Sequence, residues 1–79
     1  MIARVSVTLK PSILDPQGTT IHQALESLGF KGVKRVRMGK LIEIELKDGN
    51  TAAAKKEVER MCQKLLANPI VETYRVEIR

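Results

Sequence analysis

The chain has 79 residues, of which 43% are hydrophobic and 29% charged, and 14 Lys and Arg against nine Asp and Glu give a formal net charge of +5. This length suits one domain, residues 1–79, and excludes a multidomain enzyme. No apolar run exceeds three residues, so we expect neither a membrane span nor a signal peptide and assign the chain to the cytoplasm.

A strand and then a helix are predicted at the start of the chain. Residues 2–9 alternate between apolar and polar side chains, the pattern of a half-buried strand. Asp15 followed by Pro16 is typical of a helix start, because the Asp carboxylate can accept a free amide and Pro has no amide to lose. Thr20 offers a competing cap. Apolar residues at helical spacing then predict a helix over residues 16–28.

The middle of the chain is predicted to form a β-hairpin. Residues 32–38 and residues 40–47 each have the pattern of a strand, with apolar side chains that share an inward face. Gly39 lies between them as the hinge. A turn at residues 48–50 follows, and it leads into the next element.

A second helix and a last strand complete the chain. Residues 52–66 are rich in helix-forming side chains and carry an apolar stripe, which predicts a helix. Asn68 and Pro69 are expected to end it, because the residue before a proline avoids the helical region. Alternation over residues 73–78 predicts a strand, in which Tyr74 points to the core or to a dimer interface.

The predicted order is therefore βαββαβ. It indicates an α+β single domain with an antiparallel sheet and both helices on one face, similar to a ferredoxin-like fold. A chain this short buries only about 60 to 65% of its surface, so pairing with a second copy would hide more. We expect at least a homodimer, formed through sheet edges or exchanged strands, with further assembly into tetramers left open.

No catalytic constellation can be built from the sequence. Nucleophilic catalysis needs a thiol or hydroxyl beside a base, yet the only histidine, His22, opens the first helix and the only cysteine, Cys62, belongs to the apolar stripe of the second. Cys62 is interpreted as a core residue without a disulfide or metal partner. His22 is interpreted as a boundary residue of its helix, and a proton or phosphate contact is its alternative role. The glycines form no P-loop.

The densest charge run raises the question of RNA binding. It holds five bases in ten residues with no acid among them: Lys31, Lys34, Arg35, Arg37 and Lys40. An RNA-binding sheet stacks bases on aromatic side chains, but the chain has one Phe and one Tyr, and neither lies in a central strand. Residues 29–32 match the GXXG loop of KH domains, yet a strand rather than a helix is predicted to follow. A solvated or subunit-facing basic edge is favoured over nucleic acid.

Three segments give the chain a resemblance to a known family. They are Lys10 with LDPQG at residues 14–18, LGF at residues 28–30 leading to VRMGK at residues 36–40, and Met61-Cys62 followed by LLANPIVETY at residues 65–74. In this order, and over essentially the full length, they resemble the PurS family, the small subunits of phosphoribosylformylglycinamidine synthase.

The resemblance implies a non-catalytic subunit of a ligase. In that family a glutaminase, PurQ, releases ammonia, and a synthetase, PurL, uses ATP to couple it to formylglycinamide ribonucleotide; PurS is thought to hold the two together and to assist ammonia transfer. ATP and magnesium are then expected in PurL, and this chain is expected to bind no cofactor and no metal. The alternative is an autonomous ferredoxin-like module that binds RNA or a small ligand, which would not co-purify with a glutaminase and a synthetase.

Several residues take candidate roles on this interpretation. Asp15, Pro16, Gln17 and Gly18 form a turn that contacts a partner, or else only begin the helix. Arg37, Gly39 and Lys40, at the predicted hairpin, meet an acidic surface of PurL or PurQ, or else keep an exposed edge soluble. The remaining residues are assigned structural roles: Asn68, Pro69, Tyr74 and Cys62.

Overall fold

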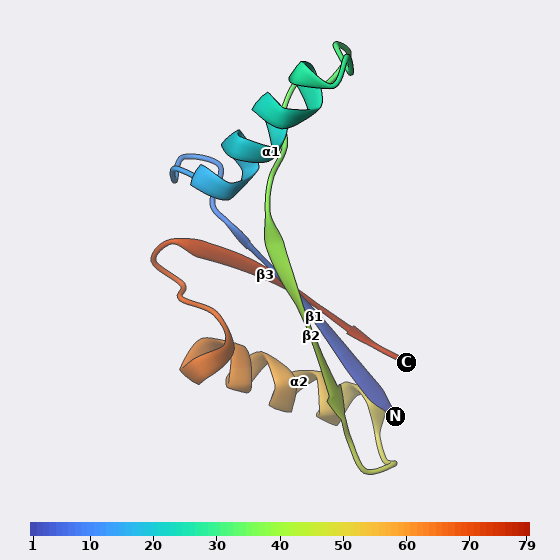
Figure 1. Cartoon of the computed structure of the whole chain (residues 1–79). Helices are drawn as coiled ribbons and strands as arrows, with labels where there is room; N and C mark the ends of the chain where they lie inside the picture. Colours follow the sequence, from blue (N-terminus) through green and yellow to red (C-terminus); the bar gives the residue numbers. More distant parts are fainter.

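The computed structural model describes residues 1–79 and contains three strands and two α-helices (Figure 1). In chain order these are β1 (Ile2–Leu9), α1 (Pro16–Ser27), β2 (Gly39–Glu45), α2 (Thr51–Met61), a π-helical turn η1 (Cys62–Leu66) and β3 (Glu72–Ile78). None of the helices is both long and apolar enough to cross a membrane. The α+β class that the sequence predicted is confirmed.

The sheet is antiparallel and has the strand order β2-β1-β3. β1 is central, and its Val5 lies opposite Ile42 of β2 and Val76 of β3. α2 and η1 cover one face of this sheet (Figure 1). The alternating residues of β1 that point to this face meet the apolar stripe of the helix, and the buried core consists of Ala3, Val5, Val7, Val58, Cys62 and Ala67. The predicted core role of Cys62 is therefore confirmed.

The hydrogen-bond pattern of the sheet decides which backbone amides face outward. Ile2 and Arg79 donate to each other's carbonyl oxygens, at 2.9 and 2.8 Å. Bonded pairs alternate with non-bonded pairs in an antiparallel ladder, so Val76, opposite Val5, belongs to a non-bonded pair. The amide of Val76 therefore faces the free outer edge of β3, and the amide of Arg75 faces β1.

Two details of the predicted arrangement, one strand and the position of one helix, are wrong. Residues 33–38 form no strand within the chain, so the hairpin hinged at Gly39 is absent, and Gly39 instead begins β2. No backbone hydrogen bond joins this segment to a neighbouring strand, and Met38 N–H donates to the Asp15 carboxylate instead. The second error concerns α1, which does not pack on the sheet beside α2.

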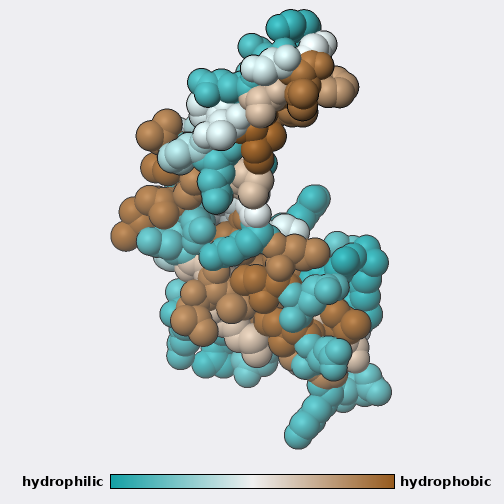
Figure 2. All heavy atoms as spheres, viewed as in Figure 1, coloured by the Kyte–Doolittle hydropathy of each residue, from teal (hydrophilic) through white to brown (hydrophobic).

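α1 belongs instead to a projecting arm, defined here as residues 10–38. It comprises the loop after β1, the helix itself and the segment that returns along it to β2 (Figure 1). The molecule measures 48 × 25 × 14 Å, and its radius of gyration of 15.9 Å exceeds the value of about 12 Å for a compact domain of this length. Figure 2 shows the arm standing clear of the sheet, with apolar side chains on its surface. These are exposed by 36 to 77% and include Leu14, Ile21, Leu28, Phe30 and Met38.

The helix ends follow the predicted signals. Asp15 caps α1 with its carboxylate, whereas Thr20 turns its hydroxyl back to the Pro16 carbonyl and caps nothing. Asn50 caps α2 by accepting from Ala53 N–H at 3.0 Å. Asn68 follows η1 and accepts from Ile70 N–H at 3.0 Å, which forms the turn into β3.

Candidate functional site at the base of the arm

Asp15 joins the two segments of the arm where they meet the sheet. Its Oδ1 accepts from Gly18 N–H at 2.9 Å, and its Oδ2 accepts from Met38 N–H at 2.8 Å. These two hydrogen bonds lower the pKa of Asp15 below its ordinary value, and the charges of Arg37 and Arg35 lower it further. One ionised carboxylate thus fixes the first turn of α1 to the residue that precedes β2.

Gly18 is the point of closest approach between α1 and the returning segment. A Cβ atom at this position would lie 2.4 Å from the Val36 carbonyl oxygen and 2.6 Å from Asp15 Oδ2. Both distances are far below van der Waals contact, and the first involves backbone that cannot turn aside. The glycine of the LDPQG segment is therefore required by the close approach of the two backbones.

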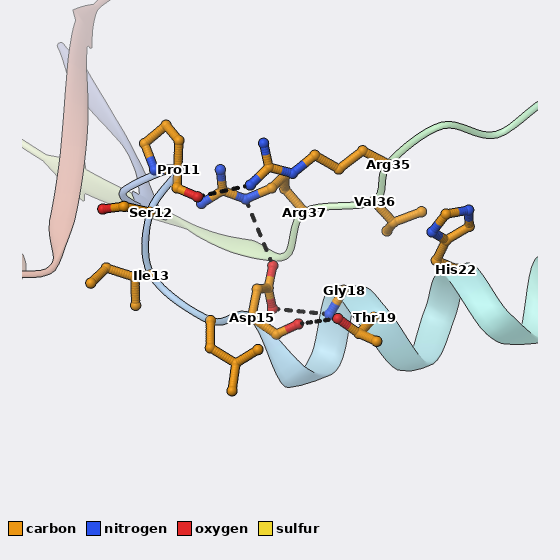
Figure 3. Close-up of a pocket in the computed structure, with 11 residues that line it drawn as sticks. Pro11, Ser12, Ile13, Asp15, Gly18, Thr19, His22, Arg35, Val36 and Arg37 are labelled. Carbon is orange, nitrogen blue, oxygen red and sulfur yellow. Dashed lines mark hydrogen bonds and ion pairs between the residues drawn. The ribbon is translucent and has the colours of Figure 1, made fainter.

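Two arginines fasten the returning segment to the end of β1. Arg37 Nη2 donates to the carbonyl oxygens of Leu9 and Lys10, the latter at 3.2 Å. Arg35 Nη2 donates to the next carbonyl along, that of Pro11, at 3.0 Å. Because the three acceptors are consecutive in the chain, the two guanidinium groups lie near each other, as Figure 3 shows.

A cavity of about 380 Å³ opens between these groups and α1. Figure 3 shows its walls: the loop at residues 11–14 on one side, the start of α1 on another and the returning segment opposite. His22 closes one end of it, with Nε2 2.9 Å from the Val33 carbonyl oxygen and 3.2 Å from Glu26 Oε1. Both neighbours are acceptors, so Nε2 carries the proton and ties α1 to the returning segment.

The residues predicted from LDPQG divide into two groups. Asp15 and Gly18 point inward, since the Asp15 side chain is 10% exposed and Gly18 is buried. Pro16 and Gln17 are exposed at the surface. Asp15 and Gly18 therefore form the helix start, while Pro16 and Gln17 remain exposed to solvent.

The structure brings most of the predicted contact residues together. Asp15, Gln17, Gly39 and Lys40 line a second hollow of about 240 Å³ on the other side of the junction. Lys40 Nζ there lies 3.9 Å from the carboxylate of Glu72, at the start of β3. Arg37 is half-buried beside Asp15, with Nε 3.9 Å from Asp15 Oδ2.

The residues predicted as structural lie apart from this junction or beneath the sheet. Asn68 and Pro69 occupy the exposed turn between η1 and β3. Tyr74 is half-buried and packs against the core. Cys62 is fully buried in the core.

Arg35 and the hydroxyl residues of the cavity were not singled out by the sequence as site residues. Ser12, Thr19 and Arg35 all line it. Of these residues, only Arg35 belonged to a feature noted in the sequence, the basic run at residues 31–40. Sequence periodicity cannot report a side chain that bonds to a loop carbonyl, as Arg35 does to Pro11.

The described residues contain no arrangement for nucleophilic or metal catalysis. Burial raises the pKa of the Cys62 thiol, with the Glu59 charge adding to the effect, so the nucleophilic thiolate is disfavoured. Cys62 lies in the core beneath the sheet while His22 lies on the arm, and no group of three His, Cys, Asp or Glu side chains could hold a metal ion.

Comparisons with known proteins agree on one family. The model of the PurS family, described as phosphoribosylformylglycinamidine (FGAM) synthase, matches residues 2–79. The chain is 47% identical over 75 residues to the synthase subunit PurS of Synechocystis sp., which covers 95% of this chain and 75% of the relative. It is 45% identical over 76 residues to PurS of Methanocaldococcus jannaschii, covering 96% of this chain and 92% of the relative.

Solved structures give the same result. The crystal structure of M. jannaschii PurS, a subunit of formylglycinamide ribonucleotide amidotransferase in the purine biosynthetic pathway, superposes with a TM-score of 0.89 at 44% identity, over 99% of this chain and 94% of that one. A chain in the structure of PurLQS from Thermotoga maritima gives a TM-score of 0.83 at 33% identity, over 98% and 96% of the two chains.

Proposed function

This chain belongs to the PurS family of phosphoribosylformylglycinamidine synthase subunits, and we propose that it is the non-catalytic small subunit of that ligase in purine biosynthesis. Its partners are a PurL synthetase and a PurQ glutaminase. The complex converts formylglycinamide ribonucleotide to formylglycinamidine ribonucleotide with ATP and glutamine. ATP and magnesium are held by PurL, and residues 1–79 act as one PurS-like domain in the cytoplasm.

The observation that carries this proposal is the match along the whole chain to PurS proteins, including the one from the PurLQS structure. A non-catalytic role also agrees with the chemistry of the residues. A glutaminase needs a nucleophile paired with a base, whereas Cys62 is a core residue and His22 bonds to a backbone carbonyl. A scaffold is useful for this reaction because ammonia released into water at neutral pH is mostly protonated, and a closed path preserves the nucleophilic form.

The base of the arm is the proposed contact surface for the large partners. Pro16 and Gln17 are exposed there, and Gly39 and Lys40 lie across the hollow from Gln17. Asp15, Gly18 and Arg37 contribute by holding this surface in shape, through the hydrogen bonds and the close approach described above. An acidic surface on PurL or PurQ would complement the basic residues of the arm.

Self-association is proposed on the remaining exposed surface. The arm leaves its apolar side chains uncovered, and β2 and β3 are both edge strands with free backbone groups. A second copy could pair with the edge of β2 or β3, or the two copies could exchange the unpaired residues 33–38. Either arrangement would bond free backbone groups of an edge strand and cover apolar side chains of the arm. We therefore propose a homodimer, with tetramers as a further step of assembly.

Reconstitution tests the proposed function. Purified PurL and PurQ should carry out glutamine-dependent synthesis with this chain and lose most of it without the chain, while synthesis fed by high ammonia should survive better because free ammonia bypasses the transfer. Equal loss of both activities would place the chain inside the synthetase chemistry instead. Failure to co-purify with either partner would favour the autonomous binding module.

A further inference from the structure

The cavity at the base of the arm carries more positive than negative charge. Its lining includes the guanidinium groups of Arg35 and Arg37 and a single acid, Asp15. Two more bases, Lys10 and Lys34, adjoin the lining segments in the chain. The Asp15 carboxylate cannot offset this excess, since one negative charge faces at least two positive charges.

The two guanidinium groups are held in place before any ligand arrives. Each is fixed by its Nη2 atom to backbone carbonyls of residues 9–11. A guanidinium has five N–H donors, and Arg35 uses one of them, on Pro11, so most of its donors remain free for a ligand. Arg37 uses its Nη2 on two carbonyls and its Nε is buried, so it contributes mainly charge. Anchored arginines with free donors favour oxyanions, because the fork geometry matches carboxylate and phosphate oxygens and little side-chain freedom is lost on binding.

The rest of the lining combines polar side chains with the apolar Ile13, Leu14 and Val36. Ser12 contributes a hydroxyl group, Thr19 donates its own hydroxyl to the Asp15 carbonyl oxygen, and His22 forms the end wall (Figure 3). The volume of about 380 Å³ exceeds that of a phosphate group alone and leaves room for the body of a small molecule. We propose that this cavity binds the phosphate group of a small phosphorylated molecule, with Arg35 as the principal ligand-contacting residue.

Charge and composition distinguish this ligand class from the two nearest alternatives. A phosphate monoester carries up to two negative charges, which matches the excess of bases around the cavity better than the single charge of a carboxylate. A nucleic acid strand would gain affinity by stacking its bases on aromatic rings, but no Phe or Tyr lines the cavity. The proposal rests on the lining of the cavity and not on the chain's role with PurL and PurQ.

The test is a titration of the ¹⁵N-labelled protein with inorganic phosphate, followed by NMR at constant ionic strength and neutral pH. Saturable shifts are expected for the amides of Ser12, Thr19 and Arg35 and for the His22 ring. Chloride at the same ionic strength should produce none of them, and acetate should bind more weakly than phosphate. Absence of saturable shifts with phosphate would overturn the proposal.

Two charge-matched variants locate the site. Arg35→Gln removes one charge and one hydrogen bond to Pro11, and it should weaken phosphate binding about tenfold, the effect of losing one charge-assisted hydrogen bond. Lys56→Gln removes the same charge from the exposed surface of α2 and should leave the affinity unchanged. Far-UV circular dichroism confirms that both variants are folded.

Two results would refute the assignment. Equal affinities of the two variants would mean that phosphate responds only to net charge. Acetate binding as tight as phosphate would assign the cavity to a carboxylate, such as an acidic side chain of a partner protein.

Discussion

Replacement of Gly18 by alanine tests whether the base of the arm is held together as the structure indicates. The added Cβ would lie 2.4 Å from the Val36 carbonyl oxygen and 2.6 Å from Asp15 Oδ2. α1 must therefore move away from the returning segment, and the Asp15 carboxylate must leave the position in which it accepts from Gly18 and Met38. A single methyl group therefore weakens both the cap of α1 and the bond from Asp15 to the returning segment.

The magnitude follows from two opposing effects. Overpacking against backbone costs about 1 to 3 kcal/mol, while alanine in a helix gains up to about 1 kcal/mol over glycine. We expect a net loss of about 1 to 2 kcal/mol in the free energy of unfolding, measured by urea denaturation at fixed protein concentration because dimerisation would contribute. Hydrogen exchange should also become faster in α1 and remain unchanged in β1, since the arm opens without the sheet.

Gly32→Ala is the matched control. No atom lies within 4 Å of a Cβ at Gly32, and its backbone lies outside the left-handed region. The variant should be as stable as the parent or up to about 1 kcal/mol more stable, because alanine reduces the freedom of the unfolded chain. If Gly18→Ala and Gly32→Ala unfold alike and exchange alike, the close approach at Gly18 does not hold the arm.

Four further predictions follow from the same structure. The pKa of Asp15 is lowered in the folded chain. The contribution of Asp15 to holding the arm should therefore be complete above the ordinary pKa of the carboxyl and lost as the pH falls below about 4. Hydrogen exchange of α1 should show this acid sensitivity, and Asp15→Asn should abolish it. Cys62→Ser should cost about 1 to 3 kcal/mol of stability through the buried hydroxyl, yet leave the activity of the assembled complex intact once folded; full loss of activity at normal stability would contradict the core role of Cys62. The isolated chain should show no glutaminase or ATPase activity, and turnover that survives repurification would refute a non-catalytic role. Val76→Pro removes an outward amide from the β3 edge and keeps the bonds to β1, so a dimer paired at that edge should dissociate in a sedimentation experiment. Arg75→Glu, on the uncovered sheet face, should leave the dimer intact. A parent chain that sediments as a folded monomer would refute the dimer itself.

Local signals were sufficient to predict the elements that bury apolar side chains. The alternation of β1 and the stripe of α2 each need only one partner surface, and they find each other in the core around Val5 and Val58. Asp15-Pro16 and Asn68-Pro69 act within a few residues of themselves, so their helix and turn roles were also accessible. The comparisons then confirmed the family that the three quoted segments indicated.

The arm could not be predicted because its structure depends on contacts between distant polar groups. Residues 32–38 alternate like a strand, but Arg35 and Arg37 bond to the carbonyls of residues 9–11, and Met38 bonds to Asp15. Alternation reports that a segment is extended and does not say which groups will satisfy its backbone. The apolar face of α1 likewise predicted packing on the sheet, whereas the structure leaves that face uncovered.

The sheet and the arm are held in place by different kinds of contact, and this difference affects function. The sheet and α2 share a buried apolar core, while the arm is fastened by polar contacts at its base, which water weakens individually. The arm is therefore expected to open at a lower free-energy cost than the sheet. Its exposed apolar side chains and the basic cavity belong to this same element. A partner that covers the apolar side chains and a phosphorylated ligand that fills the cavity would both favour the closed arm over its locally opened state, so binding of either should strengthen binding of the other.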